Sequence, residues 1–287
     1  MIDQALLSQI AIGLYKGSFY WLLAAGLTLI FGVTRIVNFA HAAFFVLGGY
    51  LMYSFYVLTG SFLLSLITSL AATGLLGALT EITLIRRIYG VPSIYQLLLT
   101  FGVTLILNDS QKLVWGKFPK YIDVPGYLKG SIQIGAISYS YYSLLLVMLG
   151  FLIFLLLHLS INKTMWGLKV RAVWRDPSVA QTLGINPKKL YTMIFLIGTA
   201  LAGLGGSLIV VLHPVGPGLG DHLIIYAFIV VVMAGLGNIV GAFVVSLLVG
   251  VLSSIFAWLI PEVDILLIYL IAALSLLVRT GGLFGER

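Results

Sequence analysis

The chain has 287 residues, of which 61% are hydrophobic and only 9% are charged, and its formal net charge is +7. So much apolar surface cannot be hidden in a water-soluble core of this size, which excludes an ordinary soluble domain and indicates a bilayer protein. The chain contains no cysteine, which excludes disulfides and thiolate metal sites, and its basic residues do not form the single aromatic-laced patch that would indicate nucleic-acid binding.

Long apolar runs follow one another along the whole chain. They cover residues 6–31, 42–59, 62–85, 93–108, 141–161, 190–212, 223–236, 240–260 and 265–279. The run at 141–161 contains no Asp, Glu, Lys or Arg, and at ~1.5 Å per helical residue it covers the ~30 Å of a hydrocarbon layer. A barrel would show short alternating segments instead. The sequence therefore predicts an all-α polytopic membrane protein, a single transmembrane domain over residues 1–287 with about eight to nine spans.

Two breaks that carry glycine and asparagine interrupt these runs, FGVTRIVNFAH at 31–41 and AGLGNIVGA at 234–242. Each is either a tight cytoplasmic turn or a discontinuous helix inside the membrane. Asn38 and His41 share one helical face, so either Asn38 caps the second helix and His41 satisfies a neighbouring carbonyl, or the pair lines a substrate path. Asn238 begins a similar Asn-x-x-Gly-Ala pattern, and transporters often contain such repeats. We therefore take Asn38, His41 and Asn238 as candidate path residues.

The distribution of basic residues predicts the sidedness. Segments 86–92 and 162–189 and the C-terminus are expected on one side, and 109–140 on the other. The first side carries Arg86, Arg87, Lys163, Lys169, Arg171, Arg175, Lys188, Lys189, Arg279 and Arg287, against Lys112, Lys117, Lys120 and Lys129 opposite. By the positive-inside rule, 162–189 is a cytoplasmic loop, 109–140 is an extracytoplasmic loop and the C-terminus is cytoplasmic. The side of the N-terminus stays open.

The stretch VRAVWRDPSVAQTLGINPKKL contains two helix starts. Asp176 is an N-cap followed by Pro177 at the first helical position, and Gly184 suits the residue just past a helix end. Asn186 before Pro187 repeats the start signal for a helix that enters the membrane. The sequence therefore predicts a helix of about seven residues followed by a new span.

This short helix cannot span a bilayer and must lie at the cytoplasmic surface. Val179 and Leu183 are one turn apart on one face. The helix is either an interfacial segment that dips this face into lipid headgroups or a docking helix for a cytoplasmic partner.

Further along, Gly198, Ala202 and Gly206 recur at every fourth position, which predicts close helix packing. Glu81 precedes Arg86 and Arg87 at a cytoplasmic helix end, which favours a local ion pair over a proton carrier. The chain shows no HExxH, GxSxG or GxxxxGK[ST] motif, so we assign it no catalytic residue, no metal site and no ATPase activity of its own.

Five ordered blocks resemble the permease subunits of branched-chain amino acid ABC importers. They are GLTLIFGVTRIVNFAHAAFFVLGGYL, EITLIRRIYG, LLLTFGVTLILNDSQKLVWG, RAVWRDPSVAQTLGINPKKLYTMIFLIGTALAGLGGSL and VMAGLGNIVGAFVVSLLVG. The resemblance implies a multi-pass permease of a bacterial or archaeal inner membrane that forms one half of a heterodimeric pore. Its implied partners are a second permease subunit, two cytoplasmic ATPase subunits that bind ATP, and a periplasmic or surface-tethered substrate-binding protein.

The resemblance also implies that the cytoplasmic loop couples the pore to the ATPases. The coupling residues would be Arg171, Arg175, Asp176, Pro177, Val179, Leu183, Gly184 and Asn186. Leucine, isoleucine and valine are the implied substrates, with no cofactor bound to this chain.

Two other classes of protein remain as alternatives. A stand-alone secondary transporter or channel for small amides or urea would more often carry carboxylates in mid-membrane. An intramembrane enzyme would need convergent polar residues, for which His41, His213 and Asp221 are the candidates.

Overall fold

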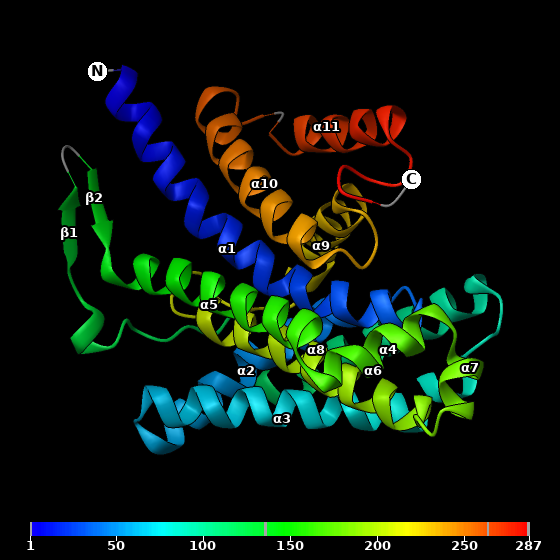
Figure 1. Cartoon of the computed structure of the whole chain (residues 1–287). Coiled ribbons are helices and arrows are strands. Elements are labelled where there is room, and N and C mark those ends of the chain that lie inside the picture. Colours follow the sequence, from blue (N-terminus) through cyan, green and yellow to red (C-terminus); the bar gives the residue numbers. More distant parts are fainter. Residues whose placement is uncertain (1, 135–136, 263, 286–287) are drawn as a thin grey trace.

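A computed structural model describes residues 2–134, 137–262 and 264–285, and most of this part of the chain is helical (Figure 1). The helices are α1 (Ile2–Thr34), α2 (His41–Thr59), α3 (Phe62–Thr83), η1 (Ile85–Ile88), α4 (Ser93–Trp115), η2 (Gly126–Leu128), α5 (Tyr141–Lys163), α6 (Met165–Arg175), α7 (Pro177–Thr182), α8 (Pro187–Ile209), α9 (Leu219–Ala234), α10 (Ile239–Leu259) and α11 (Asp264–Val278). A hairpin of β1 (Ser131–Ile134) and β2 (Ile137–Ser140) lies in the predicted extracytoplasmic loop. Residues 135–136 of that loop lie outside the described residues. So does Arg287, one of the basic residues of the predicted cytoplasmic side.

The prediction of an all-α polytopic membrane protein is confirmed. Within the described ranges, 6 helices are long and apolar enough to cross a membrane, namely α1, α2, α3, α5, α8 and α10. α9 and α11 are shorter apolar helices. Together with α4, these helices account for all the apolar runs of the sequence.

α6, which forms the first half of the predicted cytoplasmic loop, was not predicted from the sequence. It buries Gly167, Val170 and Val173 against the rest of the chain and leaves Lys169 and Arg175 exposed. Its narrow apolar stripe is too short and too interrupted by charge to register as an apolar run.

α8 is the central packing helix, and its small residues lie where other helices cross it. A Cβ atom at Gly198 would collide with Ile30 and the backbone of α1, and one at Gly206 would collide with the carbonyl oxygen of Phe45 on α2. Ala202, between them, is fully buried. Small residues let helix backbones approach closely, so dispersion contacts can replace the missing hydrophobic driving force in lipid.

α3 runs along the opposite side of α8. The hydroxyl groups of Ser69 and Ser207 lie 2.7 Å apart, and Gly77 of α3 leaves room for the side chain of Thr199 of α8. α3 and α8 are therefore joined along their length by both packing and a buried hydrogen bond.

The break at 31–41 is a discontinuity inside the helix bundle. α1 ends at Thr34, Arg35 adopts the left-handed region (φ 57°), and the chain then folds back beside α1. His41, the first residue of α2, places Nε2 3.0 Å from the carbonyl oxygen of Leu23. Leu23 is about three turns before the end of α1, or ~16 Å at 1.5 Å per residue. α2 thus begins beside α1, about three turns before the end of that helix.

α4 supplies hydrogen-bond partners to this irregular segment. Thr100 donates to the Val37 carbonyl at 3.2 Å, and Gln111 donates to the Ala43 carbonyl at 3.0 Å. Backbone groups away from water need internal partners, and non-helical backbone at membrane depth survives only where protein or water provides them. Thr100 and Gln111 of α4 therefore give carbonyl groups just before and within the first turn of α2 hydrogen-bond partners inside the protein.

The break at 234–242 is a tight turn. Gly235 and Gly237 have φ of 95° and 86°, which only glycine adopts at little cost, and Gly237 lies against Gly32 near the end of α1. The two breaks that look alike in the sequence therefore lead into helices that start at different positions along α1.

Candidate coupling surface and substrate path

α7 has the caps that the sequence predicts. Asp176 Oδ1 accepts from the backbone N–H groups of Ser178 (2.8 Å) and Val179 (3.0 Å), and Gly184 has a left-handed φ of 81° just after the helix. Asn186 Oδ1 accepts from the N–H of Lys189 at 3.2 Å and starts α8. Both predicted helix starts are confirmed.

Removing the first cap gives a small, specific effect. We expect Asp176→Ala to destabilise α7 by ~1 kcal/mol, because the side chain satisfies two otherwise unpaired N–H groups. Hydrogen exchange of residues 178–182 in the purified protein should accelerate by roughly fivefold, since each 1.4 kcal/mol is a factor of ten. Asp176→Asn, which keeps the acceptor oxygen, serves as the control and should exchange at the native rate. Equal exchange in all three proteins would contradict a capping role.

The predicted docking face of α7 is exposed. Val179 is 55% and Leu183 73% accessible, whereas Ala180 on the opposite face is buried. Neither apolar side chain is needed to pack α7 onto its own chain. They are therefore free to contact a partner or a lipid surface, and their role in coupling remains a prediction.

The two arginines of the predicted coupling set lie on α6. Arg171 donates to the carbonyl of Ile161 at the end of α5, so it fastens α6 to the preceding span. Arg175 is exposed in the last turn. In addition, Arg35 at the first break donates to the carbonyl of Trp174 at 3.4 Å, which ties α6 to the end of α1.

A groove of about 760 Å³ separates the segment after α3 from α7 and the start of α8. It is lined by Arg86, Tyr89, Gly90, Pro177, Ser178, Gln181, Gly184, Ile185, Asn186, Pro187, Lys188 and Tyr191. Segments 86–92 and 162–189, predicted to share one side of the membrane, therefore lie next to each other.

The C-terminal segment belongs to the same end of the molecule. A second cavity of about 420 Å³ is lined by Trp174 of α6, the 235–238 turn and residues of the 280–285 segment. Asn238 donates to the carbonyl of Phe284 at 2.7 Å. The three segments predicted to be cytoplasmic thus gather around α6 and α7.

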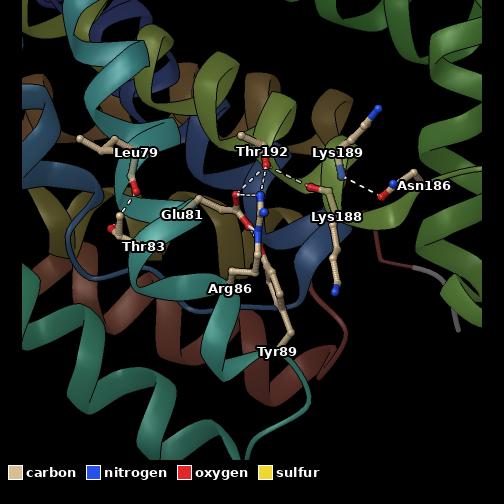
Figure 2. A network of polar contacts seen from close by, with 9 residues as sticks. All are labelled: Leu79, Glu81, Thr83, Arg86, Tyr89, Asn186, Lys188, Lys189 and Thr192. Carbon is tan, nitrogen blue, oxygen red and sulfur yellow. Dashed lines mark hydrogen bonds and ion pairs between the residues drawn. The ribbon is translucent and has the colours of Figure 1, made fainter.

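Two residues that line this groove, Arg86 and Tyr89, bind the carboxylate of Glu81 in a network of hydrogen bonds (Figure 2). Its side chain is fully buried, and its carboxylate accepts from Arg86 Nη2 (2.8 Å) and Nε (3.2 Å), Tyr89 Oη (3.2 Å) and Thr192 Oγ1 (2.6 Å). Burial, followed by the negative charge of Glu81, raises the pKa of Tyr89, which therefore stays a donor. The predicted ion pair of Glu81 with Arg86 is confirmed, while Thr192, distant in sequence, was missed.

The three candidate path residues have internal hydrogen bonds in this conformation. Asn38 is buried and its Oδ1 accepts from the N–H of Ala40 at 3.1 Å, and His41 is fully buried with Nε2 beside Leu23. Among the described residues, His41 Nδ1 has no hydrogen-bond partner. Asn238 caps α10 by accepting from Gly241 N–H at 2.8 Å and also borders the 420 Å³ cavity. Lining of a substrate path by these residues remains a prediction.

Thiol labelling tests the path. We expect Asn238→Cys to react with a small water-soluble reagent in the resting protein, because this position borders an open cavity. Asn38→Cys and His41→Cys should react only when the complex is trapped with ATP, if alternating access wets their position. The native chain has no cysteine, so each signal is attributable.

Ser207→Cys provides the control, because Ser207 is buried between α3 and α8 and should stay unreactive in both states. Unreactive thiols at positions 38 and 41 in both states would leave those residues with structural roles alone.

The structure shows no metal site among the residues that it describes. No group of three or more His, Asp or Glu side chains is placed there to hold a metal ion.

Comparison with known proteins gives a consistent result. A family model described as "Branched-chain amino acid transport system / permease component" matches residues 9–279. The chain is 29% identical over 221 residues to the high-affinity branched-chain amino acid transport system permease protein BraD of Pseudomonas aeruginosa, covering 73% of this chain and 72% of that protein. It is 27% identical over 219 residues to the permease protein LivH of Escherichia coli, covering 71% and 70%. A probable LivH of Methanocaldococcus jannaschii is 29% identical over 207 residues, covering 68% and 64%. No solved structure matches the chain significantly.

Proposed function

Because the chain belongs to the family of permease components of branched-chain amino acid transport systems, we propose that it forms one half of a heterodimeric pore in an ABC importer of leucine, isoleucine and valine. A second permease subunit completes this pore. Two cytoplasmic ATPase subunits bind ATP and drive it, and a periplasmic or surface-tethered binding protein delivers the substrate.

One observation carries the coupling part of this proposal. α7 is a capped helix outside the spans that holds two apolar side chains, Val179 and Leu183, away from its own chain. Such a face suits the helix-in-groove mode of protein recognition. The segments around α7 also carry most of the basic residues, which supports a cytoplasmic location of α6, α7 and the C-terminus in the inner membrane.

The packing supports a route for the coupling motion. α7 leads into α8 through the short joint at Gly184–Asn186, and α8 packs on α1, α2 and α3. Closure of the ATPases on ATP displaces α7, and this displacement reaches the bundle as a rigid-body movement of packed helices. Alternating access then opens the centre of the pore, close to the broken start of α2, to one side at a time.

The test is reconstitution of the chain with the proposed partner subunits. The chain should co-purify with a second permease and two ATPase subunits, and vesicles should take up leucine only with internal ATP and a binding protein. A chain that purifies alone and transports without ATP would contradict the proposal. If the vesicles take up urea or short amides in preference to leucine, the substrate is a small amide and not a branched-chain amino acid.

A further inference from the structure

The carboxylate of Glu81 is a buried charge held by separate elements (Figure 2). α3 supplies the carboxylate, the segment after α3 supplies Arg86 and Tyr89, and α8 supplies Thr192. A charge out of water is costly unless it is paired and hydrogen-bonded, and a two-pronged arginine with two hydroxyl donors meets that requirement. These elements cannot separate without leaving the charge short of partners.

The network lies at the point where the coupling loop joins the bundle. Thr192 is in the second turn of α8, directly after the joint between α7 and α8, and its Oγ1 lies 3.0 Å from the carbonyl oxygen of Lys188. That joint contains Gly184 in the left-handed region, where the backbone can bend easily. If no contact held the start of α8 to α3, displacement of α7 would bend the chain at this joint and would not be transmitted to α3.

From Thr192 onward, direct contacts continue into the bundle. Ser207 of α8 shares a hydrogen bond with Ser69 of α3 and also donates to the carbonyl of Gly48 on α2 at 3.1 Å. α2 begins inside the bundle at His41. A contiguous set of packed and hydrogen-bonded groups therefore connects the coupling loop with the candidate path.

We propose that the Glu81 network is the joint that makes the start of α8 and the end of α3 move together when α7 is displaced, so that Glu81 is a positioning residue for coupling ATP hydrolysis to transport. This inference rests on the proposed function, because it requires an ATPase that moves α7. It adds that the displacement of α7 is transmitted to α3 as well as to α8, and that the carboxylate of Glu81 transmits it to α3.

The first test measures substrate transported per ATP hydrolysed in the reconstituted complete complex. In Glu81→Gln, Arg86→Gln and Thr192→Val we expect substrate-independent ATP hydrolysis to continue, while the transport ratio falls roughly fivefold or more, as for loss of a typical coupling between sites. Arg87→Gln is the matched control, because Arg87 adjoins Arg86 but is exposed and should keep the native ratio. If a variant fails to assemble, Arg86→Lys, which keeps the charge but not the two-pronged contact, carries the same expectation.

The second test separates coupling from mere stability. Spin labels on cysteines at Lys189 of α8 and Leu79 of α3, both exposed, report the distance between the start of α8 and the end of α3. With Glu81 present this distance should be the same in nucleotide-free and ATP-trapped complexes, and with Glu81→Gln it should depend on the state. A distance that is constant in both proteins, or variable in both, would overturn the inference.

The outcomes distinguish the two proposals. A wild-type complex without ATP-driven uptake contradicts the proposed function and this inference with it. A wild-type complex with such uptake, whose Glu81→Gln variant keeps the native transport ratio, contradicts this inference alone.

Discussion

Leu183→Asp is expected to lower substrate-stimulated ATP hydrolysis by more than tenfold while leaving the permease folded in the membrane. Leu183 is 73% accessible, so the substitution removes little packing within the chain. At a docking interface the same change places an unpaired charge in an apolar contact. Central contact residues typically contribute 2 kcal/mol or more, which corresponds to roughly thirtyfold in binding of the ATPase subunits.

Two further variants at this position separate protein docking from lipid contact. Leu183→Met keeps the apolar volume and should retain activity under either interpretation. Leu183→Lys distinguishes them, because a lysine is favoured near anionic headgroups but spoils an apolar protein contact as badly as aspartate does. The measurements are co-purification of the ATPase subunits and stimulated ATP hydrolysis. Full activity of Leu183→Lys would show that α7 only rests on the lipid surface.

Local chemistry in the sequence was sufficient to predict the ends of α7. Asp176, Pro177 and Gly184 act on N–H and C=O groups within a few residues of themselves, so their pattern determines where α7 begins and ends. The apolar runs predicted the long helices for the same reason, since a membrane span must satisfy its backbone internally.

Non-local features could not be predicted in this way. The sequence did not distinguish the two glycine- and asparagine-bearing breaks, because the first is held by hydrogen bonds from Thr100 and Gln111 of α4, which are distant in sequence. Likewise, Thr192 reaches Glu81 only after α3 and α8 have packed together. Periodicity gives no information on which distant polar group will meet a buried carboxylate.

The glycine stripe of α8 leads to the strongest expected effect on stability. A Cβ at Gly206 would meet the carbonyl oxygen of Phe45 and the backbone N of Gly49, and neither atom can move without shifting α2. Gly206→Ala should therefore destabilise the purified protein by about 1–3 kcal/mol, the usual cost of overpacking. This corresponds to a fall of about 2–12 °C in the unfolding midpoint, taking ~2–4 °C per kcal/mol. Gly206→Leu, with a larger side chain, should abolish assembly of the folded permease and hence all uptake.

Gly102 offers the matched control, because it is also a helical glycine but has open space where its Cβ would lie. Gly102→Ala should be neutral or should stabilise the protein by up to about 1 kcal/mol, since alanine loses less backbone freedom on folding. The two substitutions add the same methyl group and the same helix propensity, so the difference between their unfolding midpoints isolates the clash between α2 and α8. Equal midpoints would mean that α2 and α8 can separate at Gly206 at little cost. In that case the close approach of their backbones would not stabilise the fold.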